Sequence, residues 1–117
     1  MSNKRGDLAV PPPKPGEYKI RFGARDVGVG WQALCAEAPT NTADAWFTMR
    51  TGPAPAVQTS RHHQLKYDLA TAFFNGKDRD QWQIEVTSGG RVWYVVEEER
   101  KTVWLLHAAA KHPKRTE

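Results

Sequence analysis

The chain has 117 residues, a formal net charge of +4 and a single cysteine. This length fits one domain with one modest core. We expect no membrane span, because no run of about 18 apolar residues is present, and no export, because the N-terminus lacks a basic-then-apolar leader. The lone Cys35 cannot form an internal disulfide, which favours a reducing, cytoplasmic location.

The basic excess lies at the two ends of the chain. Residues 1–16 and 111–117 are both net positive, whereas residues 17–110 hold equal numbers of acidic and basic side chains. A basic total often indicates a polyanionic partner, but terminal charges also keep a small protein soluble. Net charge alone therefore does not predict nucleic-acid binding here.

The N-terminal segment is rich in proline. Residues 1–16 include Pro11, Pro12, Pro13 and Pro15, which favour extended backbone. We expect residues 1–16 to form an arm, either flexible or docked, outside the fold. Residues 17–117 are then a single domain that ends in a basic tail.

A first strand is expected over residues 17–22, where polar residues alternate with Tyr18, Ile20 and Phe22. These three side chains should face the core.

Two helices should follow the strand. Apolar residues recur at helical spacing from about residue 24 to 38, and Pro39 should close that helix. Residues 40–42 offer caps for a second helix that ends near Arg50. The short connector implies an antiparallel pair.

The second half of the chain indicates β-structure. Residues 65–74 fit either strand or turn, and Asn75-Gly76 is typical of a hairpin turn. Residues 81–86 alternate, and residues 91–96 and 102–108 are apolar runs that suit central strands. The predicted class is α+β: an N-terminal strand, a helical hairpin, then an antiparallel meander of three to four strands with the helices on one sheet face.

Two segments resemble a known family. Residues 88–96, SGGRVWYVV, look like the strand of the RelE/ParE toxin superfamily in which a glycine turn leads into an arginine and an apolar run. Residues 102–114, TVWLLHAAAKHPK, look like its closing strand and basic tail. The order of elements is also similar, and the chain resembles uncharacterised actinobacterial RelE-like proteins.

The resemblance implies a metal-independent, cofactor-free endoribonuclease of a type II toxin–antitoxin system. Such a toxin cuts mRNA, commonly on the ribosome, and is neutralised by an antitoxin; it meets DNA only within the toxin–antitoxin complex. The RNA 2′-hydroxyl attacks its own phosphate, so the site needs a base, cations on the phosphate and an acid for the leaving oxygen.

The resemblance supplies three catalytic candidates. Arg91 matches the family arginine on the scissile phosphate, and His112 lies where the family places a proton-transferring residue. Glu85 is a candidate base, since it and Gln83 stand where some relatives have lysines. Each residue could instead be an ordinary surface side chain, and the tail lacks the tyrosine of many relatives.

Further residues are candidates for RNA binding. The family places basic residues around Arg61, His63 and Lys66, and Lys111 and Lys114 flank His112 in the tail. Trp93 shares a strand face with Arg91 and could stack on a base. We expect His107, inside an apolar strand, to be a core histidine, and we expect no metal because His62 and His63 should point apart.

Two alternatives stay open. A ParE-like toxin would inhibit gyrase without cleaving RNA, and a non-catalytic protein of this fold would only bind a partner.

Overall fold

The computed structural model describes residues 5–6 and 9–111. Along this part of the chain the elements are β1 (Lys19–Phe22), α1 (Val27–Glu37), α2 (Pro39–Thr51), β2 (His62–Gln64), β3 (Thr71–Phe74), β4 (Lys77–Glu85), β5 (Arg91–Glu97) and β6 (Thr102–Ala109), with single 3₁₀ turns at Tyr67–Leu69 and Glu98–Arg100. Within these residues, no helix has the length and apolarity that crossing a bilayer requires.

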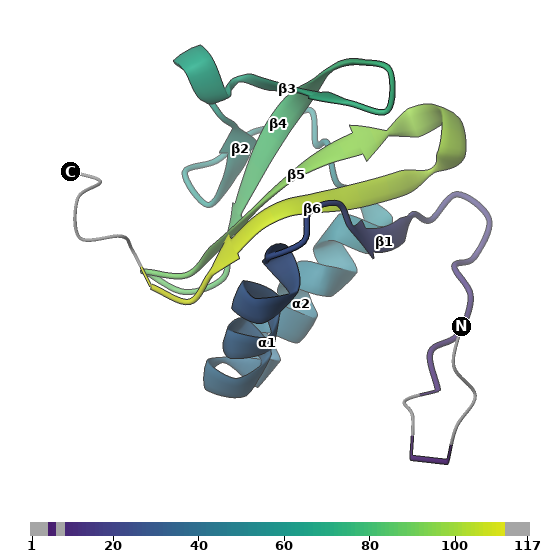
Figure 1. The fold of residues 1–117 in the computed structure, drawn as a ribbon, viewed down its shortest axis with the longest axis vertical. Helices are drawn as coiled ribbons and strands as arrows, with labels where there is room; N and C mark the ends of the chain where they lie inside the picture. The colour runs from purple at the N-terminus through teal and green to yellow at the C-terminus, as the bar shows by residue number, and fades with distance from the viewer. Residues whose placement is uncertain (1–4, 7–8, 112–117) are drawn as a thin grey trace.

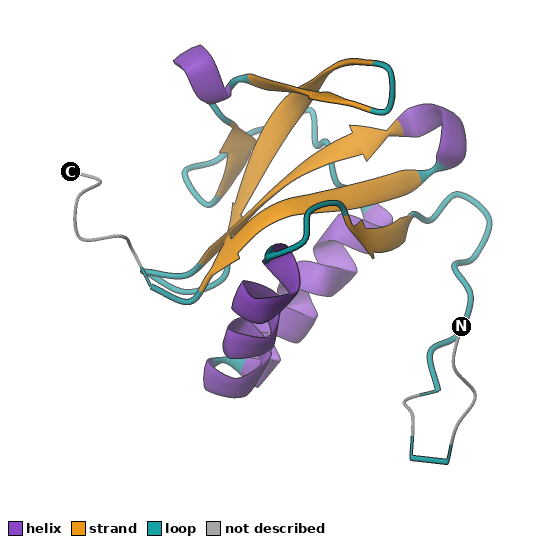
Figure 2. Ribbon diagram, in the orientation of Figure 1, coloured by secondary structure: helices purple, strands orange, loops and turns teal. Residues whose placement is uncertain are grey.

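The strands form one sheet in the order β1-β6-β5-β4-β2, and β3 also pairs with β4. β1 runs parallel to β6, whereas the other pairs are antiparallel. Both helices lie on the same side of this sheet (Figures 1 and 2). The predicted α+β class is confirmed, and β5 and β6 are central strands as expected.

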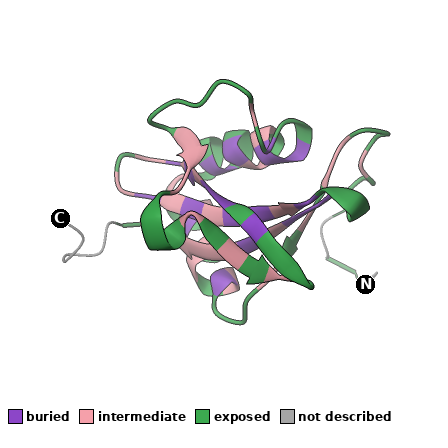
Figure 3. Cartoon of the chain, turned by 90° about the horizontal axis from the view of Figure 1, so that it is seen from above, coloured by how far each residue is buried: buried purple, intermediate pink, exposed green. Residues whose placement is uncertain are grey.

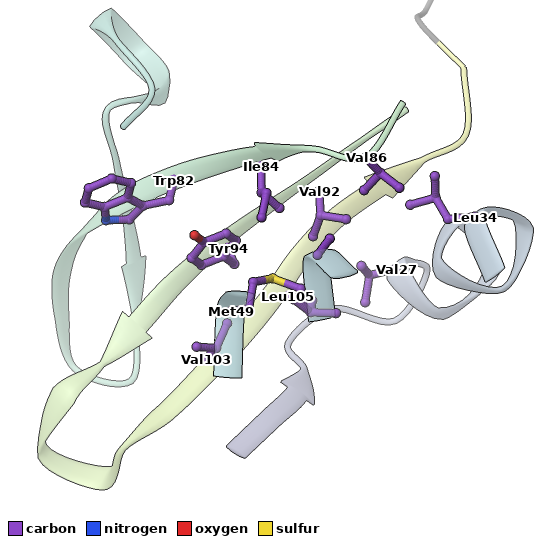
Figure 4. Packing of buried hydrophobic residues seen from close by; sticks show 11 residues of the cluster. Val27, Leu34, Met49, Trp82, Ile84, Val86, Val92, Tyr94, Val103 and Leu105 are labelled. Atoms are coloured by element: carbon purple, nitrogen blue, oxygen red, sulfur yellow. The ribbon is translucent and has the colours of Figure 1, made fainter. Parts of the chain in front are cut away.

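The core fills the space between the helices and the sheet. Leu34 of α1 and Met49 of α2 pack against Val92, Tyr94 and Leu105 of the central strands (Figure 4). All five are almost completely buried. Figure 3 shows buried positions running along the central strands, while the loops around them are exposed.

Gly30 lets α1 approach β6 closely. A Cβ atom at Gly30 would lie 1.7 Å from the carbonyl oxygen of Ala108, so no other residue fits without movement of the backbone. Gly28, two residues earlier and on another side of α1, has no atom within 4 Å of such a Cβ. The helical sequence therefore contains one glycine that packing requires and one that it does not.

The connection between the helices differs from the prediction. Pro39 does not close α1; it is the first residue of α2, and Ala38 alone separates the helices. Proline suits a first helical position because its missing N–H has no partner there anyway. The expected caps lie inside α2, where Thr42 donates to the carbonyl of Leu34 at 2.9 Å.

One aromatic residue predicted to face the core is exposed. Phe22 is 52% exposed. Phe22 ends an edge strand of only four residues, so no further strand covers it. Of the three residues expected in the core, Tyr18, just before β1, and Ile20 pack against it.

The described part of the proline-rich arm is docked. Arg50, which is buried at the end of α2, donates to the carbonyl of Pro12 at 2.7 Å and to Glu17 Oε1 at 3.0 Å. Its guanidinium also lies 4.9 Å from the ring centre of Trp46. Arg50 thus ties the segment before β1 to α2.

The hairpin of β3 and β4 covers part of the sheet face opposite the helices. Phe74 of β3 packs against Trp104 of β6 with ring centres 5.1 Å apart. Buried Arg79 of β4 donates to Glu99 at 2.9 Å, and Trp104 donates to Glu97 at 2.9 Å. The other half of this face, toward the β4–β5 turn, is not covered by the hairpin.

Candidate nucleic-acid interface

Polar and aromatic side chains form a row across the uncovered half of the sheet. The register places His63 of β2 opposite Gln83 of β4, Gln83 opposite Trp93 of β5, and Trp93 opposite His107 of β6. Residues paired across strands share one face of the sheet. All four are partly accessible. With Glu85 and Arg91, they define what we call the open face.

Trp93 is the centre of this row. Its indole Nε1 donates to Gln83 Oε1 at 2.7 Å, and its ring lies 4.7 Å from the ring of His107 at an interplanar angle of 42°. These two contacts fix the indole on both sides. The open face therefore carries a pre-oriented aromatic surface.

Charged residues form a second row beside the first. Glu85 of β4 lies directly opposite Arg91 of β5, and Arg91 lies opposite Ala109 of β6. Arg61, just before β2, approaches Glu85 with an Nε–Oε1 distance of 4.0 Å. The neighbour of Arg91 on β6 is thus a residue with a small side chain.

Two adjoining hollows border these rows. One, of about 200 Å³, is lined by Ser60, Gln83, Glu85, Ser88, Gly90 and Arg91. The other, of about 350 Å³, is lined by Gln58, Thr59, Ser60, His63, Gln64 and Lys66. Ser60 lines both hollows, so they are neighbours. Most of the residues that line them are polar or charged, which suits a polar ligand rather than an apolar one.

The neighbouring histidine, His62, serves the core instead. As the alternation predicts, it points away from His63, toward Trp82 and Tyr94. The Tyr94 hydroxyl gives its hydrogen to the carbonyl of Pro53 at 2.7 Å, so His62 Nε2 is the donor in its own bond to that hydroxyl. Burial lowers the pKa of His62 below its ordinary value.

His107 lies on the open face and not in the core, where the apolar strand pattern predicts it. Leu105 faces the helices, and strict alternation would put His107 on that same side. However, Trp93 pairs with His107 and Tyr94 pairs with Leu105, so Leu106 is an extra residue in β6. This bulge turns His107 to the open face. Burial, and secondarily the charge of Arg91, lower its pKa.

Most of the predicted site residues fall in this region. The open face and the hollows beside it bring together Arg61, His63, Lys66, Glu85, Arg91 and Trp93. Lys111 is exposed just beyond the end of β6. His112 and Lys114 lie outside the described residues, so their predicted roles stay predictions.

Comparisons with known proteins address the fold. No protein-family model matches the chain, and no curated protein matches it. Among solved structures, the archaeal RelE–RelB complex from Pyrococcus horikoshii OT3 matches with a TM-score of 0.55 and 16% identity, over 84% of this chain and 97% of that one. The toxin–antitoxin complex RelBE2 from Mycobacterium tuberculosis matches with a TM-score of 0.47 and 19% identity, over 87% and 98% respectively.

At 16% identity, the comparison with the archaeal structure identifies the fold of the chain. The chain has a RelE-like α+β fold, as the resemblance of the two sequence segments implied.

Proposed function

We propose that this chain is the toxin of a type II toxin–antitoxin pair and that it is a metal-independent endoribonuclease acting on mRNA in the cytoplasm. The observation that carries the proposal is the position of Arg91 on the open face of a RelE-like fold, between a polar hollow and an aromatic row. A guanidinium suits this role because its planar fork binds two phosphate oxygens at once.

The proposed chemistry needs no water nucleophile. The 2′-hydroxyl attacks the adjacent phosphorus, the bond to the 5′-oxygen breaks, and the products are a 2′,3′-cyclic phosphate and a 5′-hydroxyl. Arg91 would stabilise the charge that develops on the phosphate oxygens. Glu85, opposite Arg91, is the base that the sequence suggests, and His112 in the tail is the proposed acid.

The binding roles follow from the same surface. Trp93 would stack on a base beside the scissile phosphate, with a free-energy contribution of about 1–3 kcal/mol. Arg61, His63 and Lys66 border the hollows that would hold the flanking backbone. Lys111 and Lys114 would contact further phosphates, and the ribosome could present the mRNA.

An antitoxin is the proposed protein partner. The archaeal neighbour is a complex of RelE with RelB, so that chain of the same fold was solved with a partner protein. In this chain β1 leaves one strand edge unpaired within the described sheet. An extended antitoxin segment could add to such an edge.

Cleavage of a defined RNA tests the proposal. The purified chain should cut a single-stranded RNA in the presence of EDTA and leave a cyclic phosphate. The same oligonucleotide with a 2′-deoxyribose at the cut position should stay intact at that bond. Growth arrest with intact RNA and broken DNA would instead identify a gyrase inhibitor, and the absence of arrest would identify a non-catalytic binding protein.

A further inference from the structure

The bulge in β6 has a specific consequence for the open face. Without the extra Leu106, the imidazole of His107 would lie among the core side chains between sheet and helices. With it, His107 stacks on Trp93 and lies within the field of Arg91. Bulges of this kind are frequent beside active sites, where they redirect one side chain.

We propose that His107 is the group that accepts the proton of the attacking 2′-hydroxyl. This inference rests on the proposed function and changes its assignment of the base from Glu85 to His107. The open face then supplies the cation and the base from adjacent strands, Arg91 from β5 and His107 from β6.

The register places His107 suitably for this role. Arg91 pairs with Ala109, and Trp93 pairs with His107, so Arg91 and His107 are diagonal neighbours on one face. Diagonal neighbours in a sheet lie within reach of long side chains. Among the described residues, Ala109 is the β6 neighbour of Arg91, and its small side chain does not separate a phosphate bound by Arg91 from the imidazole.

Glu85 is less suited to accept the proton. Its carboxylate lies 4.0 Å from the guanidinium of Arg61, and its position on β4 pairs with that of Arg91 on β5. Its place between them fits a residue that orients the arginines. Gln83, the other polar residue at this end of β4, accepts the Trp93 hydrogen bond and carries no charge.

The surroundings of His107 favour its neutral form, which is the form that a general base needs. Among the described residues, the charge that acts on His107 is that of Arg91 on β5. Glu85 lies one strand further away, on β4. On the other side of β6, β1 ends at Phe22, which is paired with Leu105, so β1 places no charged residue beside His107. Burial and Arg91 together favour the neutral imidazole, which can take a proton at neutral pH.

The proposed step balances as follows. The 2′-hydroxyl proton passes to a ring nitrogen of His107 while the 2′-oxygen bonds to phosphorus. The 5′-oxygen leaves with the bonding electron pair and takes a proton from water or from an acid. The imidazolium then returns its proton to the solvent.

The pH dependence of single-turnover RNA cleavage tests this assignment. In the unchanged protein the rate should rise with pH through the pKa of His107, below about 6.5, and then level off. His107→Gln should lower the plateau by roughly 10²–10⁴-fold and remove this rise. Glu85→Gln should keep the rise of the rate with pH.

A binding measurement separates catalysis from folding. His107→Gln should bind the non-cleavable 2′-deoxy oligonucleotide within about threefold of the unchanged affinity, because Arg91 and Trp93 remain; a large loss of this affinity would show that the effect is structural and overturn the assignment. If the unchanged protein cleaves RNA and His107→Gln keeps its rate and pH profile, the inference is wrong although the proposed function stands. If the unchanged protein cleaves no RNA, the proposed function itself is wrong.

Discussion

Glu85 and Arg91 lie directly opposite each other at the ends of β4 and β5, next to the tight turn that joins these strands. Their pairing puts an acidic and a basic residue at neighbouring positions on the face that the helices leave uncovered. The turn is short and its Gly90 is packed against Leu34, so the two strand ends are held by the core. The candidate site is thus built on rigid elements.

The close approach of α1 to β6 predicts that replacing Gly30 and Gly28 by alanine changes the stability of the protein in opposite directions. Gly30→Ala should lower the free energy of unfolding by about 2 kcal/mol or more, because its Cβ would collide with the Ala108 carbonyl. Gly28→Ala should instead raise it by up to about 1 kcal/mol, since alanine favours helix and meets open space. Urea unfolding of both variants measures this difference; equal effects would contradict the packing.

The Tyr94 hydroxyl forms hydrogen bonds with His62 and with the carbonyl of Pro53, so removing this hydroxyl should destabilise the fold. Tyr94→Phe should lower the free energy of unfolding by about 1–3 kcal/mol, because the Pro53 carbonyl and His62 Nε2 lose their partner in a buried place. Tyr18→Phe is the matched control, since the Tyr18 hydroxyl bonds to Glu98 at the surface. Thermal unfolding should rank Tyr94→Phe as clearly the less stable variant.

His62 also predicts a dependence of stability on pH. Its pKa is lowered in the folded state, so as pH falls below about 6.5 the unfolded chain takes up the proton first. Stability should therefore decrease as pH falls from 7.5 through that window toward the lowered pKa. His62→Gln should make this decrease smaller. An unchanged slope in denaturant titrations at several pH values would contradict the role of burial.

Trp93 predicts a defined loss of RNA binding. Trp93→Ala should weaken binding of a 2′-deoxy oligonucleotide by about 1–3 kcal/mol, because one stacked base loses its platform. Phe47→Ala is the control, since Phe47 is an exposed aromatic residue on α2, away from the open face. Fluorescence anisotropy measures both affinities. Equal losses would mean that Trp93 is not the stacking residue.

Much of the fold follows from patterns in the sequence. The alternation of residues 81–86 and the apolar runs of β5 and β6 predicted the central strands, and Asn75-Gly76 predicted the hairpin, where both residues have positive φ. Pro39 was misassigned because a proline can end one helix or begin the next. In the structure Ala38 is the whole connector, and Thr42 of α2 donates a hydrogen bond across it to the carbonyl of Leu34.

The candidate site could be predicted only in part. Arg91, Glu85 and Trp93 follow from strand alternation, which places every second residue on one face. His107 does not, because one extra residue in β6 reverses the alternation and no feature of the local sequence marks Leu106 as that residue. The hydrogen bond from Arg50 to the carbonyl of Pro12 could not be predicted either, because it joins segments far apart in the chain.

The most direct test of the account is RNA cleavage by Arg91→Ala, compared with Arg21→Ala, an exposed arginine of β1 outside the open face. The account predicts that both variants fold with unfolding midpoints close to that of the unchanged protein. Arg91→Ala should lose at least about 100-fold in cleavage rate and no longer arrest growth, while Arg21→Ala keeps both activities. Cleavage and growth arrest by a folded Arg91→Ala at the unchanged level would contradict the account.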